Sequence, residues 1–222
     1  MVRNAVVGSV PLRLIQRDCK LRRRGWWFRR RFLYIYQRSS PATSYKNLSM
    51  KLLGLRAPWT VWKLRELVRL HDPALVYLSE TKCSVQRAEV VKKILNYFGL
   101  GIPSRGRSRD LLMLLRKDLD VLIQSFSNNH IDATVQASPT AARWRFIGFY
   151  GHPDVPQRRA TWCLLRQLSR QSHRPWLCMG NFNEILCQEE KQGVNVRVSW
   201  QISAFRECLS DCNLHDLGCQ GS

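Results

Sequence analysis

Acidic residues are scarce in this sequence, which holds 16 Asp and Glu against 36 Lys and Arg and has a formal net charge of +20. So large an excess of positive charge indicates an anionic partner, and DNA or RNA is the partner that we expect. The excess is uneven, because the first fifty residues contain 12 Lys and Arg and a single acid, Asp18. About half of the net charge therefore lies in this N-terminal stretch.

Paired cysteines and long apolar runs are also missing. None of the eight cysteines makes the C-x-x-C spacing of common structural zinc sites, and several lie inside apolar segments, so we expect reduced, structural thiols. No apolar run is long enough to span a bilayer, and there is no convincing secretory signal. We therefore expect no membrane partner and a nuclear or cytoplasmic location; the oligomeric state stays open.

The N-terminal stretch places arginine triplets on both sides of a Trp-Trp-Phe cluster. One interpretation is a nucleic-acid-binding or nuclear-targeting arm, in which arginines contact phosphates and aromatic rings stack on bases. The arginines concerned are Arg22, Arg23, Arg24, Arg29, Arg30 and Arg31. An organelle transit peptide is a weaker alternative. The remaining alternative is a disordered extension, and we expect residues 1–49 to be one, followed by a domain over residues 50–222.

The rest of the sequence alternates between helical and strand-like patterns, which indicates an α/β domain. Apolar residues at helical spacing predict helices over residues 60–72, 85–98, 156–170 and 200–212. Strand-like runs occupy residues 74–78, 111–116, 119–127, 131–136, 143–150 and 176–179, and the four runs between residues 111 and 150 are expected to form an antiparallel meander. Residues 99–110, rich in Gly, Ser and Arg, read as a loop.

The helix predicted over residues 156–170 is amphipathic and basic. Its apolar residues Trp162, Leu165 and Leu168 are expected to point inward. Its arginines are expected to point outward, and they are Arg158, Arg159, Arg166 and Arg170. A charged helix face of this kind is usually a solvated surface, although it could also contact nucleic acid.

The stretch Pro175–Leu186 is the most informative in the chain. It begins as a short buried strand, and polar side chains appear where that strand ends, at Asn181 and Asn183. Residues two apart on extended backbone project to the same side, so both amides would face one site while Phe182 packs on the other side. The alternative is a strand followed by an Asx turn, since Gly and Asn are common turn residues.

Two other strand ends carry side chains of interest. Glu80 follows the strand over residues 74–78, at the carboxyl edge where α/β proteins usually hold their chemistry. Tyr150 and His152 follow the strand over residues 143–150 in the sequence Tyr-Gly-His-Pro. The non-functional alternatives are that Glu80 is a solvent-exposed acid and that Tyr150 has a packed ring with its hydroxyl exposed to water.

Together, the sequences SETK, YGHP, MGNFNEIL and NLHDLG resemble those of the endonuclease/exonuclease/phosphatase superfamily, and are most similar to the endonuclease domain of plant LINE-type (non-LTR) retrotransposons. The resemblance covers about residues 50–221. It implies a two-sheet α/β sandwich of the DNase I type and Mg²⁺-dependent hydrolysis of DNA phosphodiesters. It also implies that Glu80 is the principal magnesium ligand, that Tyr150 lies on the phosphate side and that His152 belongs to a YGHP variant of uncertain role.

The sequence departs from the family pattern in several places. Asn181 stands where the family has an Asp that orients or deprotonates the nucleophile, and an amide cannot accept a proton at neutral pH. The first strand of the family, approximately SWNCRGLG, corresponds to a line beginning at Lys51 that reads as if residues, including a metal-binding Asn, were deleted. Arg109 and Asp110 replace a Gly-Gly pair, and the family's terminal Asp-His pair lies beyond Ser222.

These departures predict a fold that is incomplete at its first strand and at its C-terminus. We therefore expect a degenerate fragment of a retrotransposon DNA endonuclease with its hydrolytic activity lost and magnesium binding doubtful. One alternative is a basic fragment that binds nucleic acid without cutting it. Another is a translated remnant that does not fold stably, because missing strands expose apolar sheet edges.

Overall fold

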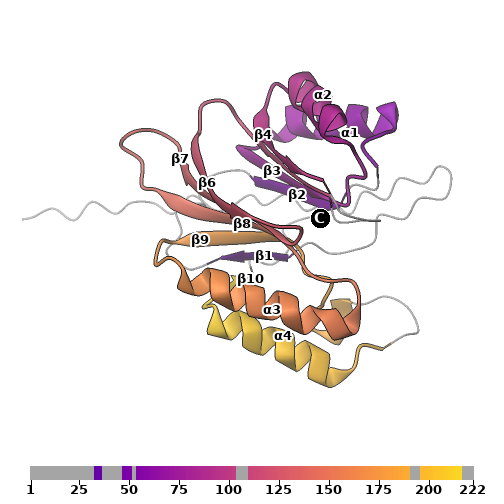
Figure 1. Ribbon diagram of the computed structural model, residues 1–222, viewed down its shortest axis with the longest axis vertical. Coiled ribbons are helices and arrows are strands. Elements are labelled where there is room, and N and C mark those ends of the chain that lie inside the picture. The colour runs from indigo at the N-terminus through magenta and orange to yellow at the C-terminus, as the bar shows by residue number, and fades with distance from the viewer. Residues whose placement is uncertain (1–32, 37–46, 52–53, 104–109, 191–195, 217–222) are drawn as a thin grey trace, which may run out of the picture.

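The computed structural model describes residues 33–36, 47–51, 54–103, 110–190 and 196–216. Two β-sheets lie face to face, with helices α1 and α2 on the outer face of one and helices α3 and α4 on the outer face of the other (Figure 1). This four-layer α/β sandwich is the fold class that the sequence predicts. Within the described residues, no helix has the combination of length and apolar composition that crossing a bilayer requires.

The larger sheet has six strands in the order β10-β1-β9-β8-β7-β6. Their bounds are β1 Leu33–Tyr36, β6 Asp120–Phe126, β7 His130–Gln136, β8 Trp144–Tyr150, β9 Trp176–Asn181 and β10 His215–Asp216. Strands β8 and β9 are parallel, with Tyr150 paired to Asn181 at their carboxyl ends. The sequence predicts an antiparallel meander of four strands over residues 111–150. Its last three strands are confirmed, since β6, β7 and β8 are consecutive antiparallel neighbours, but the first is wrong, because residues 111–115 pair within the other sheet.

The smaller sheet has four strands in the order β2-β3-β5-β4. Their bounds are β2 Asn47–Lys51, β3 Leu75–Ser79, β4 Phe98–Ile102 and β5 Leu111–Leu115. Strands β2 and β3 are parallel, and all five residues of β2 are paired, ending with Lys51 opposite Ser79. Strand β2 is therefore continuous, and the deletion expected from Lys51 onward falls partly on residues 52 and 53, which lie outside the described residues.

The four α-helices are α1 Pro58–His71, α2 Val85–Leu95, α3 Val155–Arg170 and α4 Ser199–Asp211, and a short 3₁₀-helix spans Gln188–Glu190. Proline stands in the first turn of both α1 and α3, where its missing N–H costs nothing. Helix α2 ends at Leu95 because Asn96 adopts a left-handed conformation with φ of 59°.

Three apolar clusters hold the layers together. One lies between the sheets and includes Tyr77, Met113 and Phe146. The second lies between the six-stranded sheet and helices α3 and α4, and the third lies between the four-stranded sheet and helices α1 and α2. Strands β3, β5, β8 and β9 are buried along their whole length because they are covered on both faces, which explains their continuous apolar sequences.

The boundary expected between residues 49 and 50 falls inside β2. Strand β1 also comes from the expected extension, and it is hydrogen-bonded between β9 and β10. The two strands add backbone pairing to both sheets. The six arginines proposed to bind nucleic acid, from Arg22 to Arg31, lie outside the described residues.

Strand β4 was not predicted, because its sequence FGLGI reads as the end of a helix followed by a loop. The structure pairs β4 with β5 from Phe98 to Ile102. A Cβ atom at Gly99 would overlap the backbone of Met113, and Gly99 has a φ of 156°. Glycine is therefore required for close approach to β5, and the residue that suggests a loop is the one that permits the strand.

A buried ion pair links strands β7 and β8. The guanidinium of Arg145 donates to both carboxylate oxygens of Asp132, at 2.8 and 2.6 Å, and donates a third hydrogen bond to the carbonyl of Leu168 in α3. Both side chains are almost fully buried. Removal of one partner would leave the other charge buried without compensation.

We therefore expect Asp132→Ala to lower the free energy of unfolding by about 3–5 kcal/mol, because Arg145 loses its bidentate partner. The matched control is Asp118→Ala, which removes the partner of Arg116 from an exposed pair. The control should cost less than about 1 kcal/mol. Denaturant-induced unfolding followed by circular dichroism measures both values, and equal losses would show that the buried pair has no special weight.

Candidate functional site

The candidate site lies where strands from the two sheets end beside one another. Glu80 directly follows β3, and Tyr150 is the last residue of β8. The hydroxyl of Tyr150 donates to Oε1 of Glu80 at 2.7 Å, across the gap between the sheets. Glu80 is only 6% exposed and has a left-handed backbone with φ of 58°, so its carboxylate is fixed by both the hydrogen bond and the turn.

Asn181 and Asn183 form a tight turn at the end of β9. Oδ1 of Asn181 accepts the backbone N–H of Asn183 at 3.0 Å, and Asn183 has a φ of 55°. The Asx-turn interpretation is thus confirmed, and the expectation that both amides project from extended backbone is wrong. Phe182 packs as predicted, stacked on Phe149 with ring centroids 5.2 Å apart.

The side chain of Asn183 connects this turn to the end of β8. Its Nδ2 donates to the carbonyl of Gly151 at 2.6 Å, and the N–H of Gly151 donates to the carbonyl of Asn181 at 2.8 Å. The glycine at position 180 is required here, because a Cβ atom would overlap the carbonyl of Phe149. The turns that follow β8 and β9 therefore form one hydrogen-bonded unit.

Three buried polar atoms near these strand ends have no hydrogen-bond partner within the described part of the chain. They are Nδ2 of Asn181, Oγ of Ser79 and the hydroxyl of Tyr77. Asn181 is only 2% exposed, so water does not readily compensate its unpaired N–H groups. Burial, followed by the nearby Cys178 and Tyr150, raises the pKa of Tyr77 well above its usual value, so its hydroxyl stays protonated.

A buried carboxylate behind the turns holds them in place. Glu184 accepts from Arg158 at 2.9 Å and pairs with Arg197 at 2.7 Å. Arg158 also donates to the carbonyls of His152 and Pro153, at 3.2 and 2.8 Å. Arg197 donates to the carbonyl of Asn183 at 3.3 Å.

This ion triplet therefore ties helix α3, the turn after β9 and the segment before α4 to the candidate site. The triplet was not predicted from the sequence, where Arg158 was expected to point outward. That expectation is wrong, since Arg158 is only 5% exposed. The acid in MGNFNEIL was a visible signal, but its partners lie 26 and 13 residues away in the sequence.

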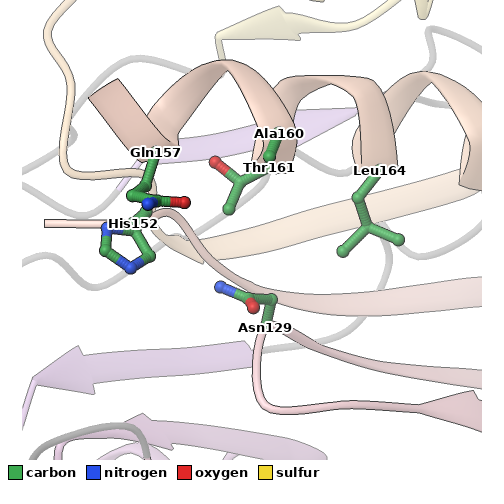
Figure 2. A pocket seen from close by; sticks show the side chains of 6 residues that line it. All are labelled: Asn129, His152, Gln157, Ala160, Thr161 and Leu164. Atoms are coloured by element: carbon green, nitrogen blue, oxygen red, sulfur yellow. The ribbon is translucent and has the colours of Figure 1, made fainter. Parts of the chain in front are cut away.

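A cavity of about 300 Å³ lies beside the strand ends, between helix α3 and the turn that precedes β7. Figure 2 shows the six side chains that line it, which are Asn129, His152, Gln157, Ala160, Thr161 and Leu164. His152 is buried, and its Nδ1 accepts the backbone N–H of Asp154 at 3.1 Å. This bond leaves the proton of a neutral imidazole on Nε2.

Magnesium is the cofactor that the sequence resemblance implies. Magnesium prefers carboxylate, carbonyl and water oxygens in octahedral geometry. Of the expected residues, Glu80 supplies one carboxylate, whereas Oδ1 of Asn181 is engaged by a backbone N–H and its Nδ2 presents hydrogens. The described residues contain no group of three or more His, Cys, Asp or Glu suited to a metal. Glu80 is thus the single carboxylate among the expected site residues that could hold a magnesium ion.

The end of β2 shows a further difference from the family pattern. The pattern SWNCRGL that the resemblance implies can also be aligned with SMKLLGL, from Ser49 to Leu55, at its Ser, Gly and Leu without a deletion, which would place Lys51 opposite its Asn. The pairing of Lys51 with Ser79 puts this residue beside the start of the Glu80 turn. The spacing between Ser49 and Gly54 in the sequence is the feature that allows this alignment.

We expect Glu184→Gln to lower the free energy of unfolding by about 3 kcal/mol or more, because the buried Arg158 and the partly buried Arg197 lose their counter-charge. Denaturant-induced unfolding followed by intrinsic tryptophan fluorescence measures this loss. The matched control is Glu207→Gln on the exposed face of α4, which should change stability by less than about 0.5 kcal/mol. If Glu184→Gln were as mild as the control, the triplet would not hold the turns.

Comparisons with known proteins agree on the fold. No family model matches the chain, and no curated protein matches it. Among solved structures, the endonuclease domain of TRAS1, a telomere-specific non-LTR retrotransposon, is similar with a TM-score of 0.59 and 14% identity. That match covers 78% of this chain and 73% of the other.

Two AP endonucleases are also similar. LMAP from Leishmania major gives a TM-score of 0.54 at 14% identity, covering 82% of this chain and 67% of that one. An AP endonuclease from Archaeoglobus fulgidus gives 0.53 at 13% identity, covering 74% and 68%. Identities this low show the fold alone. The described sheets and helices, with these likenesses, give the chain the DNase I-like sandwich fold of the endonuclease/exonuclease/phosphatase proteins.

Proposed function

We propose that this chain is a degenerate copy of a retrotransposon DNA endonuclease that binds nucleic acid but no longer hydrolyses it. The observation that carries the proposal is the state of Asn181. Its Oδ1 accepts a backbone N–H, and its buried Nδ2 has no hydrogen-bond partner among the described residues. An acidic side chain at this place would offer acceptor oxygens in both positions.

The chemistry of hydrolysis explains why this substitution matters. Metal-assisted cleavage of a phosphodiester needs charge neutralisation on the phosphate and a group that orients or deprotonates the attacking water. Glu80 supplies the charge of a single carboxylate, and the amide of Asn181 cannot accept a proton at neutral pH. Lys51 adds a positive charge to the sequence at a position where the family has a neutral metal-binding residue. The site therefore lacks both sufficient charge neutralisation for the phosphate and a group that can deprotonate the attacking water.

Binding of nucleic acid needs less than cleavage does. A chain with net charge +20 releases counterions when it contacts phosphates, so its affinity for DNA or RNA should fall steeply with salt. Lys82 is exposed two residues after Glu80, so positive charge also lies at the candidate site itself. The basic N-terminal stretch would add further phosphate contacts.

The likeness to TRAS1 supports an origin among non-LTR retrotransposon endonucleases, and the motifs in the sequence favour the plant LINE type. The alternative of an unstable remnant is disfavoured by two observations. The inter-sheet cluster is well buried, and β1 and β10 add two strands beyond β9 in the six-stranded sheet.

Plasmid nicking in the presence of Mg²⁺ tests the proposal. We expect no nicking by the unmodified chain. Asn181→Asp should restore a proton acceptor and two acceptor oxygens, and in combination with Lys51→Asn it should produce nicking at about 100-fold or more above the background of the assay. Adding Glu80→Ala to that double variant should abolish the gain, because the one remaining carboxylate ligand is lost.

Nucleic-acid binding is followed in parallel by fluorescence anisotropy with labelled DNA at several salt concentrations. Binding without turnover supports the proposal. Robust nicking by the unmodified chain, abolished by Glu80→Ala alone, would overturn the loss of hydrolysis. Failure of the double variant to nick, despite a normal circular dichroism spectrum, would show that these two substitutions do not account for the loss.

A further inference from the structure

We propose that the cavity between α3 and the β6–β7 turn binds a single nucleobase of a bound nucleic-acid strand. The inference rests on the nucleic-acid binding proposed above and assigns it a recognition site. The cavity is lined by three polar side chains, Asn129, His152 and Gln157, and by Ala160, Thr161 and Leu164 of helix α3.

Hydrogen bonds connect the wall of the cavity directly to the candidate site. Nδ2 of Asn129 donates to the carbonyl of Tyr150 at 2.8 Å, and the N–H of Tyr150 donates to the carbonyl of Asn129 at 2.8 Å. The hydroxyl of the same tyrosine bonds Glu80. A strand whose phosphate lies near Glu80 and Tyr150 would therefore carry a base close to Asn129.

The polar groups of the cavity match the edges of a base. Within the described part of the chain, neither Oδ1 of Asn129 nor the side-chain amide of Gln157 has a hydrogen-bond partner. Asn and Gln amides each combine donor and acceptor atoms, which is the pattern that base edges present. Figure 2 shows Asn129 and Gln157 on opposite sides of the cavity, so a flat group between them could contact both.

The remaining wall is apolar. The hydroxyl of Thr161 donates to the carbonyl of Arg158 at 2.7 Å, and Figure 2 shows its methyl group turned toward the cavity. Ala160 and Leu164 continue the same face of α3. An apolar wall with polar groups at its rim suits the face and the edge of an aromatic heterocycle, as in proteins that bind unstacked bases.

The size and rigidity of the cavity agree with this occupant. A volume of about 300 Å³ is at the lower end for small-molecule sites, which fits one base better than a larger ligand. Its walls are held before binding, because the N–H of Asn129 donates to Oγ of Ser127 at 3.1 Å and Arg158 anchors the start of α3 to Glu184. Pre-formed walls reduce the entropy lost on binding.

The test compares two fluorescently labelled single-stranded oligonucleotides of equal length by anisotropy. One carries normal bases, and the other consists of abasic nucleotides with the same phosphates. The full chain should bind the base-bearing strand about tenfold more tightly, since stacking and edge contacts are lost in the abasic strand. Leu164→Trp, which fills the cavity, should remove that difference and leave the affinity for the abasic strand unchanged.

The matched control is Gln167→Trp, which adds the same indole to an exposed position of α3 outside the cavity. It should behave as the unmodified chain. Gln157→Ala leaves the cavity open and removes one amide, so it keeps the inference testable if Leu164→Trp fails to fold. It should weaken binding of the base-bearing strand alone, by about threefold or more.

The outcomes separate the two proposals. Tight binding of both oligonucleotides with equal affinity, unaffected by Leu164→Trp and Gln157→Ala, would overturn the base site and leave nucleic-acid binding intact. Equal losses in Leu164→Trp and Gln167→Trp would also overturn it, because the effect would not belong to the cavity. Absence of binding to either oligonucleotide would overturn the proposed function on which the inference rests.

Discussion

The hydrogen bond between Tyr150 and Glu80 joins the carboxyl ends of strands from opposite sheets. Its geometry depends on the packing of both sheets through Tyr77, Phe146 and the other residues of the inter-sheet cluster. Because β8 and β9 are parallel, the same packing brings Asn181 beside Tyr150. The packing of the two sheets therefore determines which side chains meet at the candidate site, and the turns after the strands determine their final orientation.

Much of the fold can be predicted from the sequence, because burial of a strand on both faces restricts the residues that it can contain. Strands covered on both faces need continuous apolar residues, so β3, β5, β8 and β9 are recognisable without any partner in view. Strand β4 was not recognisable, because it needs small residues where its backbone contacts β5. Small residues are also common in loops, so the sequence suggested a loop. The buried state of Arg158 was equally hidden, since a helical pattern cannot distinguish a solvated arginine from one that meets Glu184.

The candidate site was predicted residue by residue only where its members follow strand ends. Glu80 and Tyr150 meet as side chains, while Asn181 and Asn183 meet through a turn that extended-strand geometry did not anticipate. His152 lies in the wall of the cavity, where its Nδ1 accepts the backbone N–H of Asp154. Asn129 and Gln157 gave no signal, because their proximity is created by the packing of α3 on the sheet and not by any local pattern.

The ion triplet around Glu184 has an evolutionary consequence. It holds the backbone of both site turns with charges that the protein itself supplies, in addition to the hydrogen bond between Asn181 and Asn183. The codons for Asn and Asp differ at one nucleotide, and so do those for Lys and Asn. A copy whose scaffold is self-supporting in this way can lose its chemistry by point changes while keeping its architecture, and selection could act on that architecture for a different purpose.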